Sequence, residues 1–169
     1  PEKYRSFLKD AVDCNMNMIR VWGGGIYEDD VFYDICDELG LMVWQDFMFS
    51  CSVYAGDNRF LNSVRDEVVY NIKRLMNHPS LALYCGNNEC ETAVLRWYQM
   101  DSTRWRSYER IFHELIPEAC VEIDPSRDYW PASPHSIESS DPGASMDGDC
   151  HVWDVWHGAK KLEYYQTIP

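Results

Sequence analysis

The stretch Pro79-Ser-Leu-Ala-Leu-Tyr-Cys-Gly-Asn-Asn-Glu89 says more about the fold than any other part of this chain. Its apolar run, Leu81 to Cys85, follows a helix-stopping Asn77-His78-Pro79 and ends in Gly86-Asn87-Asn88-Glu89. The pattern predicts a buried strand that delivers two amides and a carboxylate at its C-terminal end. Reactive groups of parallel α/β sheets and barrels lie at that end of the strands. Desolvation beside an apolar strand would raise the pKa of Glu89, as a general acid requires.

Helical and strand-like segments alternate on both sides of this stretch. Helical spacing predicts helices at residues 3–13, 31–39, 60–76, 91–100, about 104–123 and 158–165. Short apolar runs predict strands at 15–22, 41–47, 81–85, 129–133 and 150–156. Regular alternation with short connections implies an α/β fold with a parallel sheet and right-handed crossovers. An open doubly wound sheet and an incomplete TIM (β/α)8 barrel both fit, because a full barrel takes about 250 residues.

Composition and charge limit the function classes. The chain has 169 residues, of which 46% are hydrophobic, so it can bury a core as one domain. Its formal net charge is −13, with 15 basic against 28 acidic residues. Nucleic acid and anionic membranes are therefore excluded as expected partners. No apolar run reaches the roughly 18 residues that a transmembrane helix needs.

The cysteines and histidines bear on compartment and metals. The seven cysteines are scattered and form no Cys-x-x-Cys motif. Buried thiols in a reducing compartment explain them better than disulfides, which predicts a cytoplasmic protein. Because Pro1 looks like the middle of a longer chain, a signal peptide before it is the open alternative. His151 and His157 are six residues apart with no further ligand at zinc spacing, so we expect no metal.

The glycine run Gly23-Gly24-Gly25 follows a predicted strand. A dinucleotide-binding motif would need glycine at position 28, where Glu28 stands, so we expect no nucleotide cofactor. Two other interpretations are favoured together. The glycines supply a turn with positive φ, and their small size leaves room beside Trp22 for a ligand.

Several candidate site residues have a purely structural alternative. Glu89 could satisfy the free amides of a helix N-terminus, with Asn87 and Asn88 as caps. Asp46 ends the strand at 41–47 and is either a cap or an acid of a pocket. Trp97 lies eight residues after Glu89, just over two helical turns, and belongs either to the core or to the rim of a pocket.

Tryptophan is unusually frequent, with seven residues in the chain. Several lie near predicted strand ends, namely Trp22, Trp44, Trp153 and Trp156. For Trp22 the structural alternative is core packing. Because aromatic faces stack on the C–H faces of sugars, this concentration predicts a carbohydrate site.

Three blocks together resemble the β-mannosidases of glycoside hydrolase family 2. They are residues 17–28 (NMIRVWGGGIYE), 39–49 (LGLMVWQDFMF) and 77–89 (NHPSLALYCGNNE). The resemblance covers nearly the whole chain, and Arg-Val-Trp-Gly-Gly-Gly at 20–25 is typical of the mannosidase branch. It implies a catalytic TIM barrel and a retaining exo-glycosidase that releases terminal β-D-mannose without a cofactor.

The resemblance also implies residue roles. Glu89 matches the acid/base at the end of barrel strand 4, and Asn88 matches the amide that holds the sugar 2-hydroxyl. Arg20 matches a residue beside the nucleophile. The other matched substrate-binding positions are Trp22 and Trp97 in the subsite for the terminal mannose, Asp46 at the tip of strand 3, and Trp153 near the nucleophile, where many members have Tyr.

The nucleophile of that family, a Glu in a Ser-Glu-Phe/Tyr-Gly block on strand 7, has no counterpart here. The chain ends at Thr167-Ile168-Pro169, and Glu163 lies in a helical segment. Residues 1–169 are therefore expected to form a partial catalytic barrel domain, about strands 2 to 6 with their helices, of a larger multi-domain glycosidase. These residues alone are expected to be inactive, and their two free sheet edges favour self-association into a homo-oligomer.

Two alternatives stay open at this point. One is a related family 2 glycosidase that acts on another sugar, such as a β-galactosidase, a β-glucuronidase or an exo-β-glucosaminidase. Those enzymes carry a Ser-His or similar pair where Trp22-Gly23 stands here. The other is a non-catalytic fragment that binds sugar.

Overall fold

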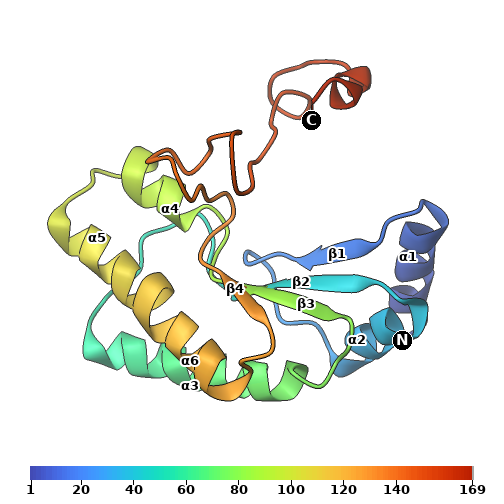
Figure 1. Cartoon of the computed structure of the whole chain (residues 1–169), viewed down its shortest axis with the longest axis horizontal. Coiled ribbons are helices and arrows are strands. Elements are labelled where there is room, and N and C mark those ends of the chain that lie inside the picture. The colour runs from blue at the N-terminus through green and yellow to red at the C-terminus, as the bar shows by residue number, and fades with distance from the viewer. Residues whose placement is uncertain (169) are drawn as a thin grey trace.

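A computed structural model describes residues 1–168 of the chain (Figure 1). The sheet has four parallel strands in chain order: β1 (Met18–Val21), β2 (Met42–Asp46), β3 (Leu81–Cys85) and β4 (Asp128–Trp130). The helices that precede β1, β2 and β3 are α1 (Glu2–Asp13), α2 (Asp30–Leu39) and α3 (Asn58–Leu75). The prediction of an α/β fold with a parallel sheet is confirmed.

The connection from β3 to β4 is longer and contains two π-helical segments. It runs through α4 (Cys90–Thr92), η1 (Ala93–Trp97), α5 (Ser102–Glu109), η2 (Arg110–Leu115) and α6 (Ile116–Ile123), in which η1 and η2 are the π-helices. Pro117 lies in the first turn of α6, directly after the π-helical segment η2.

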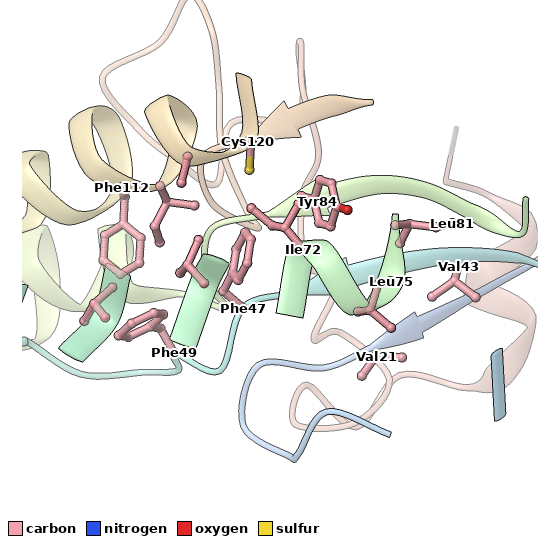
Figure 2. Close-up of a cluster of buried hydrophobic side chains, with 14 of the residues drawn as sticks. Val21, Val43, Phe47, Phe49, Ile72, Leu75, Leu81, Tyr84, Phe112 and Cys120 are labelled. Atoms are coloured by element: carbon pink, nitrogen blue, oxygen red, sulfur yellow. The ribbon is translucent and has the colours of Figure 1, made fainter. Parts of the chain in front are cut away.

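The core lies between the sheet and the helices that cover one of its faces. Right-handed crossovers between strands that follow one another in one direction place their helices on the same face. Val43 and Tyr84 from the strands are fully buried against Ile72 and Leu75 of α3 (Figure 2). Tyr84 also stacks on Phe47, with ring centroids 5.8 Å apart. This packing fixes the direction of β2 and β3, and therefore the place where both strands end.

Helix α3 shows how the sequence sets its own boundaries. The side chain of Asp57 accepts hydrogen bonds from the amides of Arg59 and Phe60, at 3.0 and 3.1 Å, which caps the first turn. Its buried residues recur at helical spacing, at positions 61, 64, 68, 71, 72 and 75. The helix ends at Leu75, just before the predicted stop at residues 77–79.

The predicted strand at 150–156 and helix at 158–165 are wrong. Residues 150–156 have no strand partner among the described residues, and the nearest backbone pairing is the antiparallel bridge between His135 and Asp149. The chain turns instead, because the amides of His157 and Gly158 both donate to the carbonyl of Trp153. A short 3₁₀ helix, η3 (Leu162–Gln166), replaces the predicted helix. The described sheet therefore has four strands, not five, and the C-terminal segment leaves it (Figure 1).

Two further properties concern thiols and membranes. Among residues 1–168 all seven cysteines are free, and four of them are buried, namely Cys36, Cys85, Cys90 and Cys120. Within the same range no helix combines the length and the apolar character needed to cross a bilayer.

We predict that Ile72→Ala lowers the free energy of unfolding by about 2–5 kcal/mol, because it opens a cavity in the fully buried contact between α3 and the sheet. Asp66→Ala on the exposed side of the same helix is the control and should change it by less than about 0.5 kcal/mol. Urea unfolding monitored by circular dichroism measures both. Similar losses in the two variants would contradict the packing described here.

Candidate active site

The loops that follow β2, β3 and β4 stay paired beyond the ends of the strands. Parallel bridges join Ser50 to Asn88 and Asn88 to Ser133. The amide of Cys51 donates to the carbonyl of Asn88 at 2.8 Å, and the amide of Glu89 donates to the carbonyl of Ser133 at 2.9 Å. Three connections thus meet at the carboxyl edge of the sheet and hold the backbone of residues 88 and 89 from both sides.

Glu89 has an unusual backbone conformation. Its φ of 59° and ψ of 12° lie in the left-handed region, which non-glycine residues seldom occupy. Such strain costs on the order of 1–3 kcal/mol and persists only where the surroundings enforce it. Here the surroundings are the bond to Ser133 and the bond from the amide of Ala93 to the carbonyl of Glu89, at 2.8 Å. Strain of this kind gathers at functional sites.

Glu89 is buried, with 8% of the residue exposed, and its carboxylate has two side-chain partners. His151 Nδ1 lies 2.5 Å from Glu89 Oε1, and the thiol of Cys51 lies 3.5 Å from Oε2. The hydrogen bond from His151 lowers the pKa of Glu89, and this outweighs the partial burial that raises it. The predicted rise in pKa is therefore wrong for this resting arrangement, because a histidine that spacing does not place there lies beside the carboxylate.

Asp46 is an anchor below the site. Its carboxylate is fully buried and accepts hydrogen bonds from Arg20 Nη2 at 2.7 Å, the amide of Gly23 at 2.9 Å and Trp44 Nε1 at 2.9 Å. Asp46 does not line the cavity described below, which differs from the predicted contact with substrate. Its buried charge is matched by Arg20, and its oxygens are occupied by donors, so it fixes Arg20 in place.

Arg20 links three strands through its guanidinium group. Besides Asp46 it donates from Nη2 to Asn88 Oδ1 at 3.2 Å, and its Nη1 lies 3.4 Å from His151 Nε2. The amide nitrogen of Asn88 donates to Ser50 Oγ at 3.3 Å. The side chains at the ends of β1, β2 and β3 therefore form one connected polar network beside Glu89.

A cavity of about 520 Å³ opens above this network. It brings together five of the predicted site residues: Arg20, Trp22, Asn88, Glu89 and Trp153. Trp22 and Trp153 are each 49% exposed, so ring faces are available to a ligand. A small polar floor between exposed aromatic walls is suited to a sugar. Its other lining residues are Cys51, Cys150, His151, Val152, Trp156 and Tyr165.

Trp97 does not line this cavity, contrary to the prediction. The prediction assumed α-helical turns from Glu89 onward, whereas η1 is a π-helix that ends with a bond from the amide of Tyr98 to the carbonyl of Ala93. The i→i+5 bonding pattern changes the angle between residues along the segment. The side chain of Trp97 is half exposed outside the cavity.

The glycine run is explained by close packing and not by backbone angles. Gly23, Gly24 and Gly25 do not have positive φ, so the predicted left-handed turn is wrong. A Cβ on Gly23 would lie 2.5 Å from the carbonyl oxygen of Phe49, and one on Gly24 would overlap the indole ring of Trp22. The glycines therefore fix how Trp22 folds back over its own loop.

Six lining residues were not predicted as site residues: Cys51, Cys150, His151, Val152, Trp156 and Tyr165. The spacing of His151 and His157 bears only on a metal site. The signal that could have identified it is its place in the apolar run 150–156, where a histidine needs a polar partner. Its partners Glu89, Arg20 and Ser133 lie 62, 131 and 18 positions away, so spacing alone does not reveal them.

One group of side chains has the composition of a metal site. Asp34, Asp37 and His78 place ligand atoms within 4.8 Å of one another. His78 Nδ1 lies 2.7 Å from one oxygen of Asp37, and the amide of Ser80 donates to the other at 2.8 Å. Because Ser80 precedes β3 while Glu89 follows it, this group lies at the opposite end of the strand from the cavity. Its bonds tie α2 to the turn before β3.

Comparisons with known proteins give one consistent group of relatives. The β-mannosidase B of Neosartorya fischeri is 43% identical over 180 aligned positions, which cover 99% of this chain and 21% of that protein. The β-mannosidase B of Thermothelomyces thermophilus is 38% identical over 94% of this chain and 20% of its own length. The chain thus spans about one fifth of the length of the curated relatives it matches. No protein-family model matches the chain.

Solved structures agree with the sequence relatives. The crystal structure of a β-D-mannosidase from Dictyoglomus thermophilum matches with a TM-score of 0.89 and 46% identity, over 99% of this chain and 20% of that one. A β-glucuronidase of Bacteroides uniformis matches with a TM-score of 0.62 and 25% identity, over 76% of this chain and 15% of that one.

We predict that Asp46→Ala lowers the free energy of unfolding by about 3 kcal/mol, because Arg20, whose side chain is 28% exposed, would lose its buried counter-charge. Glu38→Ala is the matched control. It breaks the ion pair between Arg5 and Glu38, whose side chains are 52% and 57% exposed, respectively. Because both side chains are exposed, the loss should cost at most about 1 kcal/mol. Chemical denaturation at low salt measures both values, and equal losses would argue against a special role of the Asp46 pair.

Proposed function

The chain is homologous to the β-mannosidases, and on this premise we propose that it forms the acid/base side of the active site of an exo-β-mannosidase that releases terminal β-D-mannose residues. The observation that carries the proposal is the cavity in which Glu89, held in a strained conformation, faces Arg20, Asn88 and two exposed indole rings. Relatives named β-mannosidase support the substrate class.

We propose further that the sheet is an arc of a family 2 TIM barrel, incomplete in this chain. The four parallel strands are hydrogen-bonded in chain order, without the reversal of strand order that marks a doubly wound sheet. Candidate reactive residues follow the carboxyl ends of the strands, as in barrel enzymes. Counting from Glu89 at the end of strand 4, β1 to β4 correspond to barrel strands 2 to 5.

The proposed mechanism is double displacement with retention. A carboxylate outside residues 1–169 attacks the anomeric carbon while Glu89 gives a proton to the leaving oxygen. In the second step Glu89 accepts a proton from water, which releases the sugar. Retention requires the two carboxyl groups to lie about 5 Å apart. The residues of this chain protonate, orient and stack on the sugar, and alone they do not complete the reaction.

The network below the cavity suits these tasks. Arg20 and Asn88 place polar side chains at the floor, where sugar hydroxyls and the attacking carboxylate would lie, and Asp46 holds Arg20 from beneath. Trp22 and Trp153 offer ring faces on which an apolar sugar face can stack. Binding on several sides positions the anomeric carbon for attack.

A panel of 4-nitrophenyl glycosides tests the sugar assignment on the full-length enzyme. We expect β-mannoside to be hydrolysed with kcat/KM at least about 10²-fold above galactoside, glucuronide and glucosaminide, since a site built around specific hydroxyls rejects epimers strongly. Preference for another sugar in the panel would replace the mannoside assignment by that of a related glycosidase. No turnover of any member would remove the hydrolase proposal.

We predict that Glu89→Gln in the full-length enzyme lowers kcat/KM by about 10²–10⁴-fold for a phenyl mannoside, because the general acid is lost. A 2,4-dinitrophenyl mannoside needs little acid assistance, so its first step should be nearly unchanged and azide should restore turnover. Glu163→Gln changes an exposed carboxylate of η3 and serves as the control. An equal loss on both substrates without azide rescue would count against Glu89 as acid/base.

A further inference from the structure

His151 is the one imidazole in the cavity, and both of its ring nitrogens have polar neighbours. Nδ1 lies 2.5 Å from Glu89 Oε1, while Nε2 lies 3.0 Å from Ser133 Oγ and 3.4 Å from Arg20 Nη1. The side chains of His151 and Glu89 are 19% and 11% exposed. The imidazole is thus fixed between the candidate acid and the backbone loop after β4.

The polar groups around Nε2 determine whether this nitrogen carries a hydrogen. Asp149 accepts from Trp130 Nε1 at 2.7 Å and, on its other oxygen, from Ser133 Oγ at 2.6 Å. Because the single hydroxyl hydrogen of Ser133 is directed to this carboxylate, Ser133 Oγ can only accept from Nε2. Arg20 Nη1 could donate to Nε2 only across 3.4 Å, whereas Ser133 Oγ lies at 3.0 Å, so Ser133 is the closer partner. Nε2 therefore carries a hydrogen.

The contact at Nδ1 then requires a second hydrogen. Without one, a lone pair of Nδ1 would face a lone pair of Glu89 Oε1 at 2.5 Å, which is repulsive. The hydrogen lies either on Nδ1, next to a carboxylate, or on Glu89, next to a neutral ring. The two groups together hold one acidic proton in either case, and such a pair titrates as a unit.

We propose that His151 is a positioning residue that stores the catalytic proton of Glu89. This inference rests on the proposed function and adds to it how the site is kept protonated. At rest the proton lies between Nδ1 and Oε1 while Nε2–H donates to Ser133. When the glycosidic bond breaks, the proton passes from Glu89 to the leaving oxygen, which leaves a carboxylate and a neutral His151. In the second step the proton taken from water by Glu89 restores the pair, so protons balance over the cycle.

The surrounding charges fit this role. Glu89 and Arg20 face His151 from the ends of β3 and β1, and Asp149 lies behind Ser133 next to β4. Arg20 is itself neutralised by Asp46, so it does not expel a second positive charge from the ring. The contact with His151 that lowers the pKa of Glu89 also keeps a proton within 2.5 Å of its carboxylate.

The test uses His151→Asn in the full-length enzyme, because the Asn amide can still donate near the position of Nδ1 but cannot carry an acidic proton. The quantity measured is kcat/KM as a function of pH for phenyl and 2,4-dinitrophenyl mannosides. For the phenyl substrate we expect the alkaline limb to move to lower pH by about 2 units, because the variant has no second group that holds the acidic proton beside Glu89. The dinitrophenyl substrate should lose far less activity at neutral pH.

Two further variants complete the design. His113→Asn changes an exposed histidine of η2 outside the cavity and should leave both profiles unchanged. Ser133→Ala keeps the ring but removes the acceptor of Nε2, and should shift the alkaline limb in the same direction by a smaller amount. It also provides the readout if His151→Asn fails to fold. An unchanged alkaline limb in a folded variant, or equal losses on both substrates, would overturn the inference.

The outcome for His151 can be separated from that for the proposed function. If Glu89→Gln lacks the leaving-group dependence and the azide rescue, the proposed function itself fails. If Glu89→Gln has both, while His151→Asn keeps the wild-type alkaline limb, only the inference about His151 fails.

Discussion

The buried ion pair between Asp46 and Arg20 is the interaction on which the carboxyl edge of the sheet depends. A carboxylate with no exposed surface is tolerated only when its charge is matched and its oxygens are bonded. Asp46 meets both conditions with groups from two strands and one loop, since Arg20 comes from β1, Trp44 from β2 and the amide of Gly23 from the turn between β1 and α2. Asn88 and His151 both lie within reach of the guanidinium group that this pair holds in place. Arg20 orients Asn88, and Asn88 precedes the strained Glu89.

The apolar core and the polar network position different parts of the site. The core between α3 and the sheet fixes where β2 and β3 end, because Val43, Tyr84 and Ile72 are fully buried in it. The network then fixes what the ends of the strands present to the cavity. The C-terminal segment adds the outer wall with Trp153 and His151, although it contributes no strand.

Much of this arrangement could be predicted from the sequence, and the failures have physical causes. The segments from residue 2 to 85 follow hydrophobic periodicity, which is local information, and their predicted positions agree closely with the structure. The strand predicted at 150–156 is wrong because the apolar residues of this segment cover a cavity. Apolar content alone does not distinguish a segment that covers a cavity from a buried strand. The predicted position of Trp97 is wrong because the spacing of apolar residues does not indicate that this segment is a π-helix. The predicted direction of the pKa shift of Glu89 is wrong because the shift depends on His151, a partner 62 positions away.

The left-handed backbone conformation of Glu89 favours certain residue types at this position, independently of its carboxylate. Glycine or asparagine would occupy these dihedral angles at lower cost than glutamate does. Natural selection acting on folding alone would therefore favour those residues at position 89, so an acidic side chain persists there only under selection for chemistry. A descendant released from that selection would be expected to gain thermal resistance as it lost its activity, a trade-off that places the stability optimum and the functional optimum of this position at different amino acids.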